Sequence, residues 1–185
     1  MKRIKPSDPC GIMSELIDVV DPSDNVIGKA AREEVHNSDA WHRGVHLFIF
    51  NSSGKLFLPL RSQTKDKFPS TYDCSVSEHV NAGETFEDAA RRGANEELGI
   101  PDAKLVKKLK FRMNYGPNDS MISVLYECRH DDDILIDEDE TQDVRLLSLN
   151  EIGDMLAENE TEFAPWSREL MKWYLGLASM IEEIV

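Results

Sequence analysis

Two adjacent carboxylates, Glu96 and Glu97, have the residue type and the spacing for divalent-metal chemistry. They lie near the end of a predicted helix over 86–98, where the negative end of the helix dipole is unfavourable to acidic side chains. A hard cation such as Mg²⁺, which takes carboxylate and phosphate oxygens, would offset this charge. The alternative is a solvated pair in which Arg92 is the i,i+4 partner of Glu96. The residue types alone leave both interpretations open.

The predicted helix has signals at both of its ends. Thr85, with Asp88 three residues on, makes a capping box, and Gly99 tolerates the left-handed conformation that stops a helix. Residues three and four apart share a helix face, so positions 93, 96 and 97 are expected to lie close together. The helix therefore presents the two carboxylates beside whatever stands at position 93.

The same segment, 83–100, resembles the Nudix box, G-x5-E-x7-R-E-U-x-E-E-x-G-U with U aliphatic, a loop-helix-loop that holds Mg²⁺ against a diphosphate. The matching residues are Glu84, Arg92, Glu96, Glu97, Gly99 and Ile100. The resemblance implies a hydrolase acting on phosphoanhydride bonds, with Mg²⁺ or Mn²⁺ as cofactor. Glu96 and Glu97 would be catalytic metal ligands, and Glu84 either a further ligand or the partner of Arg92.

Two positions depart from the box. Glu78 stands where the first Gly belongs, and Gly93 stands where the Glu after Arg belongs. A Gly inside a helix costs ~1 kcal/mol relative to Ala, so Gly93 marks either a close approach of ligand or backbone or simple drift. Our hypothesis is that Glu78 is catalytic and supplies a carboxylate to replace the one missing at Gly93.

Segments before the box resemble the N-terminal extension of Nudix proteins similar to type I isopentenyl-diphosphate isomerase. This extension is expected over 15–44 and includes 18–21, 26–28 and 32–36. In that isomerase group three histidines and two acids build a metal site, and the matching residues are His36, His46, His79 and Asp119. The resemblance implies a second metal at the histidines, or a polar pocket wall where none binds. His42 has no match and is interpreted as structural.

Three cations are candidates for binding the diphosphate of a substrate. Arg61 and Lys65 repeat the R-x-x-x-K spacing of the isomerase group, and Arg32 matches a further cation of that group. Arg binds a phosphate through two nitrogens and Lys as a point charge. The alternative is that Arg61 and Lys65 belong to a polar loop.

The isomerase chemistry uses a Cys and a Glu, and neither is present at the matching positions. Ser77 occupies the Cys position and Met121 the Glu position. A thioether neither ligates a hard metal well nor carries a proton. We therefore expect a hydrolase first, an isomerase as the alternative, and a diphosphate-binding module without turnover as a third possibility. The group attached to the diphosphate stays open.

The elements that position these residues alternate between strands and helices. Strand-like runs lie at 15–20, 45–50, 55–60, 72–80, 105–115, 121–128 and 144–149. Helical signals lie at 86–98, at 151–158 after an Asn150 cap, and from Trp166 to about Ile184, the helix of the segment 165–185. This order predicts an α/β (α+β) chain with a mixed sheet between helices, and the resemblance implies the Nudix α/β/α sandwich.

Composition and charge limit the classes of function and partner that remain possible. A chain of 185 residues is about one domain long, and no apolar stretch approaches the ~20 residues of a membrane span. A formal net charge of -14 repels polyphosphate backbones and argues against a nucleic-acid polymer as partner. Cys10, Cys74 and Cys128 are far apart in the sequence, as in free thiols of a cytoplasmic protein. A small diphosphate-containing substrate is the expected partner, and a homodimer stays open.

Overall fold

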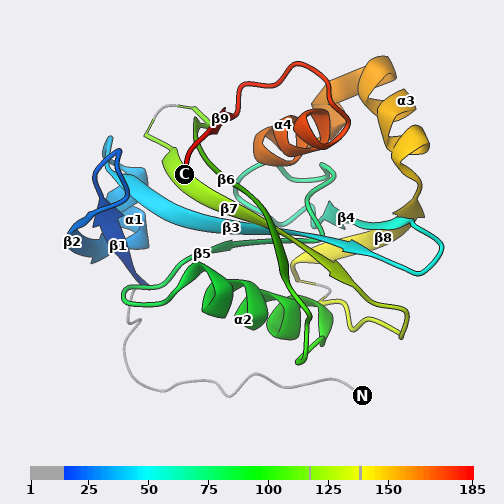
Figure 1. Ribbon diagram of the computed structural model, residues 1–185, viewed down its shortest axis with the longest axis horizontal. Helices are drawn as coiled ribbons and strands as arrows, with labels where there is room; N and C mark the ends of the chain where they lie inside the picture. The colour runs from blue at the N-terminus through cyan, green and yellow to red at the C-terminus, as the bar shows by residue number, and fades with distance from the viewer. Residues whose placement is uncertain (1–14, 117, 138) are drawn as a thin grey trace.

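The computed structural model describes residues 15–116, 118–137 and 139–185, and within them nine strands and four α-helices form one unit (Figure 1). The strands are β1 (Leu16–Val20), β2 (Val26–Ala31), β3 (Trp41–Phe50), β4 (Leu56–Arg61), β5 (Val76–His79), β6 (Val106–Asn114), β7 (Ser120–Arg129), β8 (Thr141–Leu147) and β9 (Glu182–Glu183). The helices are α1 (Arg32–His36), α2 (Phe86–Leu98), α3 (Leu149–Asn159) and α4 (Pro165–Tyr174).

The strand β3 organises a mixed sheet. It pairs in parallel with β7, from His42 opposite Met121 to Phe50 opposite Arg129, and antiparallel with β1, β4 and β5. On the far side of β7 the sheet continues through β6 to β9, while β8 extends it from β4. This arrangement confirms the predicted fold class.

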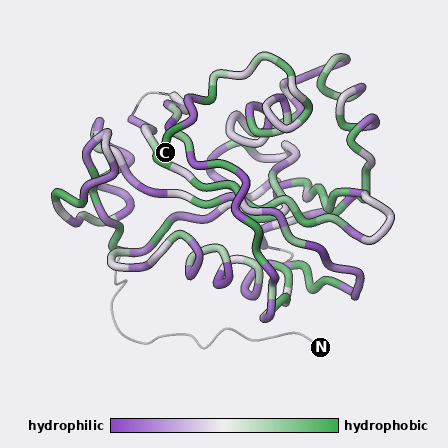
Figure 2. Tube along the Cα trace, viewed as in Figure 1, coloured by the Kyte–Doolittle hydropathy of each residue, from purple (hydrophilic) through white to green (hydrophobic). Residues whose placement is uncertain are grey.

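The sheet lies between two helical layers, with α2 on one face and α3 and α4 on the other (Figure 1). Side chains alternate along a strand, so Val45, Leu47 and Ile49 of β3 pack in the core beneath α2. Phe48 and Phe50 pack in the second core beneath α3 and α4. The outer turns of α2 are hydrophilic, whereas the central strands that it covers are hydrophobic (Figure 2).

The helix α2 begins and ends where the sequence predicts. The Thr85 hydroxyl accepts a hydrogen bond of 3.1 Å from the backbone N–H of Asp88, which satisfies one free donor of the first turn. At the other end Gly99 has φ = 70°, the left-handed conformation that a residue with a side chain rarely adopts. These two caps fix the positions of the carboxylates on the last turns of the helix.

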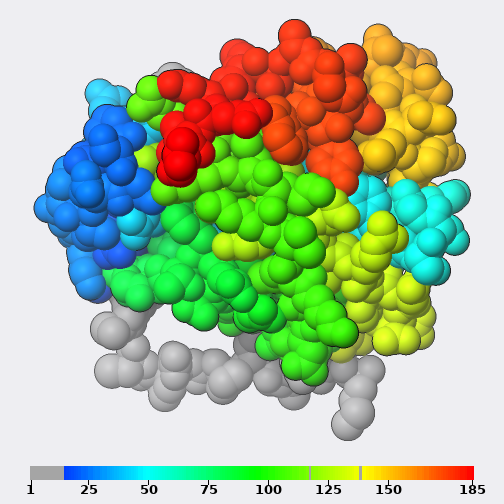
Figure 3. Space-filling model, viewed as in Figure 1, coloured from blue at the N-terminus to red at the C-terminus, as the bar shows by residue number. Residues whose placement is uncertain are grey.

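The structure corrects the predicted C-terminal helix of the segment 165–185. The helix α4 ends at Tyr174, and Gly176 then adopts a left-handed φ of 71°. The chain turns back so that β9 pairs with β6 at the edge of the sheet, and the last residues lie on the surface of the molecule (Figure 3). The predicted Asn150 cap is also wrong, because Ser148 caps α3 and Asn150 lies inside it.

The N-terminal segment 15–44 contains the strand β2 and the helix α1, which the sequence did not predict. β1 and β2 form an antiparallel hairpin, and the short helix α1 follows at once. α1 carries Arg32 at its start and His36 at its end, so it delivers both to one edge of the sheet. Cys10 lies outside the described residues, whereas Cys74 and Cys128 are free and buried. Within the described ranges, no helix is long and apolar enough to cross a membrane.

Candidate functional site

Arg92 of α2 is the centre of a group of carboxylates. Its Nε donates to Glu84 Oε1 at 3.0 Å, and its Nη2 donates to the carbonyl oxygen of His79 at 2.8 Å. Its Nη1 lies 3.2 Å from Glu78 Oε2 and 3.5 Å from Glu96 Oε2. The structure thus brings together three acids that the sequence singled out, one each from β5, from the loop before α2 and from α2 itself. We call Glu78, Glu84, Glu96 and Glu97 the acidic centre.

Glu97 is a half-buried member of the acidic centre. Burial raises the pKa of its carboxyl well above the usual range, and the nearby carboxylates of Glu78, Asp73 and Glu140 raise it further, against Lys65. Burial also raises the pKa of Glu78, with Arg92 acting in the opposite direction. Three carboxylates around one guanidinium, with Glu97 beside them, leave excess negative charge. Carboxylate oxygens in excess are the donor set that suits Mg²⁺ or Mn²⁺.

Three histidines form a second cluster. One ring nitrogen from each of His36, His42 and His79 lies within 4.8 Å of the others, and His36 Nε2 is 3.0 Å from His79 Nε2. Asp119 Oδ1 lies 3.7 Å from His36 Nδ1 and 4.0 Å from His42 Nε2. Both His42 Nε2 and Asp119 Oδ1 are buried without a hydrogen-bond partner. These unpartnered ligand atoms fit a metal ion, and we call the four residues the histidine centre.

The register of the sheet explains why His42 belongs to this centre and His46 does not. Gly44 of β3 pairs with His79 of β5, and His42 and His46 lie on the same face of β3 as Gly44, two residues to either side. Four residues along a strand span ~13 Å, so only one of these histidines reaches the centre. The structure thus places His42, and not the predicted His46, beside His36 and His79, and metal ligation by either residue stays a prediction. The alternation His42, Gly44, His46 places both histidines on one face, and only the pairing with β5 distinguishes them.

The histidines of the centre are neutral at pH 7. Burial lowers the pKa of His42 to about 4, helped by the neighbouring His36, and burial also lowers the pKa of His79 well below its usual range. The pKa of His36 is lowered by burial and by Lys67, against Asp119. A neutral imidazole is the form that ligates a metal.

His46 lies in a separate buried polar network. Its Nδ1 is 3.1 Å from the Ser77 hydroxyl, and its Nε2 is 3.5 Å from the hydroxyl of Tyr115. The Ser77 hydroxyl donates to Asp73, which also accepts from the Trp166 indole N–H. Ser77, at the position that matches the Cys of the isomerase group, thus makes hydrogen bonds with His46 and Asp73. Met121, at the position that matches the Glu of that group, is buried in β7.

We expect His46 to make stability fall as the pH falls. Burial lowers its pKa to about 4, against Asp73, so below pH 6.5 the unfolded chain binds a proton that the folded chain does not. The free energy of unfolding should therefore decrease from pH 6.5 to 4, by about 3 kcal/mol for a shift of this size. Denaturant unfolding of wild type and His46→Gln in chelator should show a shallower decrease in the variant. At pH 8 the pH-dependent difference should vanish, and parallel curves over the whole range would contradict the assignment.

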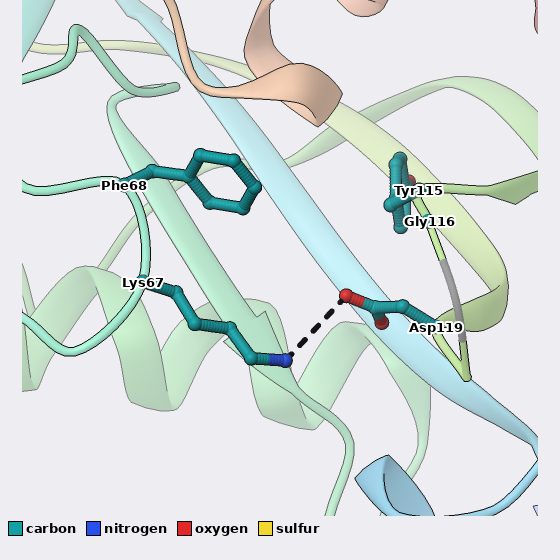
Figure 4. Close-up of a pocket in the computed structure, with 5 residues that line it drawn as sticks. All are labelled: Lys67, Phe68, Tyr115, Gly116 and Asp119. Carbon is teal, nitrogen blue, oxygen red and sulfur yellow. Dashed lines mark ion pairs between the residues drawn. The ribbon is translucent and has the colours of Figure 1, made fainter.

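A pocket of about 330 Å³ opens beside the histidine centre, lined by Lys67, Phe68, Tyr115, Gly116 and Asp119. Phe68 and Tyr115 stand on opposite sides, and Lys67 points across to Asp119, 3.7 Å from its Oδ2 (Figure 4). Trp166 contacts both rings, with centroids 5.5 Å from Phe68 and 6.1 Å from Tyr115. The pocket therefore combines aromatic walls with one cation. The spacing that pointed to Lys65 gave no signal for Lys67.

The three predicted phosphate-binding cations have different surroundings. Arg61 donates to Asp73 and to the carbonyl oxygens of Lys67 and Phe68, so its guanidinium anchors the loop beside the pocket. Lys65 pairs with Glu140. Arg32 is more open, with its side chain 54% exposed and Nη1 3.6 Å from Glu15. Phosphate binding by these three residues stays a prediction.

The chain is similar to known proteins in both sequence and fold. A family model described as NUDIX domain matches residues 40–174. An uncharacterised Nudix hydrolase of Nostoc is 40% identical over 120 residues, which cover 63% of this chain and 70% of that protein. An isopentenyl-diphosphate Delta-isomerase 2 of Photorhabdus laumondii is 28% identical over 86% of this chain and 92% of its own. The crystal structure of DR0079 from Deinococcus radiodurans superposes with a TM-score of 0.67 and 28% identity, over 78% and 90% of the two chains.

Proposed function

Because the chain belongs to the Nudix family, we propose that it hydrolyses a diphosphate linkage in a small molecule, with Mg²⁺ or Mn²⁺ bound at the acidic centre. The observation that carries the proposal is the group of three carboxylates held around Arg92, with the carboxyl of Glu97 close enough to Glu78 for their charges to interact. When bound, the ion supplies charge neutralisation for the phosphates and activation of the attacking water.

The residues of the acidic centre have different roles in this proposal. Glu96 and Glu97 would hold the ion, because both lie on the last turns of α2, where Glu96 shares Arg92 with other acids and Glu97 is surrounded by negative charge. Glu84 acts mainly by positioning Arg92, since its two oxygens accept hydrogen bonds of 3.0 and 3.2 Å from that guanidinium. Glu84 Oε2 also accepts from the backbone N–H of Asn81. These contacts favour the pairing role over ligation for Glu84.

The organic part of the substrate binds in the aromatic pocket. Phe68, Tyr115 and Trp166 offer faces for a flat or apolar group. Lys67 and Arg32 are exposed cations close to the histidine centre, and we assign them to binding the phosphates of the substrate. Because an aromatic pocket and two cations would accept many organic groups, nucleoside, sugar, coenzyme and prenyl diphosphates are all candidate substrates.

The experiment that tests the proposal is a substrate panel with purified protein and Mg²⁺ or Mn²⁺. Nucleoside di- and triphosphates, nucleotide sugars and isopentenyl diphosphate are incubated, and products are identified by phosphate release and by mass. Metal-dependent cleavage of a phosphoanhydride bond is the expected result. Binding of a diphosphate without turnover would overturn the hydrolase in favour of a module that binds only.

A second candidate function is isomerisation of a prenyl diphosphate. The histidine centre and the isomerase of Photorhabdus laumondii favour it. Ser77 and Met121 argue against it, because neither supplies the proton donor and acceptor that the reaction needs. Conversion of isopentenyl to dimethylallyl diphosphate in the panel would establish this candidate instead.

We expect the histidine centre to bind one transition-metal ion. Titration of chelator-treated protein with Co²⁺ or Zn²⁺ should reach one equivalent with micromolar or better affinity, and the ion should raise the melting temperature. His42→Gln should weaken this binding by about 10- to 100-fold or more, because it removes the nitrogen that lacks any other partner. His130→Gln is the matched control, since His130 lies at the end of β7 beyond the centre. Equal affinity in both variants would contradict a metal at these residues.

A further inference from the structure

Position 93 in the middle of α2 has no room for a side chain. A Cβ built on Gly93 would lie 2.7 Å from Cγ1 of Val76 and 2.8 Å from Cγ of Glu78, closer than real Cβ contacts. Gly93 is buried and helical, so this is a close approach of β5 to the helix and not a turn. The glycine is required by what lies opposite it.

The side chain opposite Gly93 is a carboxylate that comes from the strand. Along β5, Val76 and Glu78 point to α2, while Ser77 and His79 point to the other face. Glu78 therefore passes its aliphatic stem over Gly93. The carboxylate ends beside the helix, with Oε2 3.2 Å from Nη1 of Arg92.

The same guanidinium nitrogen also meets Glu96. Nη1 of Arg92 is 3.5 Å from Glu96 Oε2, so the carboxylates of β5 and of α2 share one positive group. A pairing role alone would need only one carboxylate at Nη1. The second carboxylate adds negative charge to a centre that already holds Glu84 and Glu97.

Building on the proposed hydrolase, we propose that Glu78 is a carboxylate of the metal-binding centre, and that it occupies, from β5, the place that a Glu at position 93 would otherwise fill from α2. Glu78 and Gly93 form a matched pair in this arrangement. The two departures from the box are one exchange: the carboxylate moves from helix to strand, and the glycine moves from strand to helix. Either change alone removes the carboxylate or creates a clash.

The first test measures Mg²⁺ binding by isothermal titration calorimetry, with the Mg²⁺-induced rise in melting temperature as a second readout. Mg²⁺ is chosen because it prefers oxygen ligands, so the histidine centre does not compete. Glu78→Gln, which keeps the stem over Gly93, should weaken Mg²⁺ binding by about 10- to 100-fold. Glu87→Gln is the control, since Glu87 is an exposed acid of α2 that pairs with Arg91.

The second test reverses the exchange. Because Val76 also approaches position 93, V76A/E78G is the background, and V76A/E78G/G93E adds the carboxylate back from the helix. The background should bind Mg²⁺ as weakly as Glu78→Gln, and the triple variant should regain at least about tenfold. Circular dichroism checks that each variant is folded.

The outcomes separate this inference from the proposed function. Weakened binding in both Glu78→Gln and Glu97→Gln supports the matched pair. Weakened binding in Glu97→Gln with wild-type affinity in Glu78→Gln overturns the matched pair and leaves the hydrolase standing. Wild-type affinity in Glu97→Gln overturns the metal site itself. Because Glu78→Gln retains the packing of the wild type, a failure of the triple variant to fold does not remove the test.

Discussion

We expect Glu97→Gln to abolish most of the proposed metal-dependent hydrolysis, with kcat lower by about 10²- to 10⁴-fold, the range for loss of a group that holds or moves a proton or a metal at a reacting centre. Glu97 is a half-buried carboxylate of the acidic centre, surrounded by the negative charge of Glu78, Asp73 and Glu140. The amide keeps the size of the side chain and removes its charge. The measurement is kcat and KM with the best substrate of the panel over a range of Mg²⁺ concentrations.

The matched control for this prediction is Glu87→Gln on the same helix. Glu87 is exposed in the first turn of α2 and pairs with Arg91, so its amide variant should keep kcat within about twofold. If Glu97→Gln retains kcat and changes only KM, Glu97 binds substrate and does not hold the catalytic ion.

Arg92→Met lowers the free energy of unfolding by about 3 kcal/mol at pH 7. The variant keeps an aliphatic stem but leaves Glu78, Glu84 and Glu96 without their shared cation, and unpaired, partly buried charges are strongly destabilising. It also removes the donor to the carbonyl oxygen of His79. Urea unfolding followed by circular dichroism measures the change.

Arg91→Met, the neighbouring residue, is the control for Arg92→Met. Its side chain is 43% exposed and faces Glu87, so the loss should stay below about 1 kcal/mol. The deficit of Arg92→Met should also shrink as the pH falls, since protonation removes the unpaired charge, and Glu78 has a raised pKa because of its burial. Equal losses in the two variants at pH 7 would show that Arg92 does not hold the acidic centre together.

Local signals predicted the helix of the acidic centre well. The bounds of α2, its Thr85 cap and its Gly99 end all follow from residues within one segment. Such signals work because capping and left-handed glycine depend on backbone geometry that a few neighbouring residues determine. Glu96 was therefore placed on the correct turn from the sequence alone.

Signals that depend on strand register were not available from the sequence. The choice between His42 and His46 depends on which residue of β3 meets His79 of β5, and that pairing is a contact between distant segments. The position of Lys67 beside Asp119 depends likewise on where a loop packs. The helix α4 ends early because Gly176 adopts a left-handed φ. This role of Gly176 is visible only once β9 is seen to return and pair with β6.

The strand β5 separates the acidic centre on one of its faces from the histidine centre on the other. Its four residues send Glu78 to the acidic centre and Ser77 and His79 to the opposite face. A slip of one residue reverses every side chain of a strand. An insertion or deletion just before β5 would thus put hard oxygen donors among the histidines and imidazoles beside α2, so that both centres are lost together.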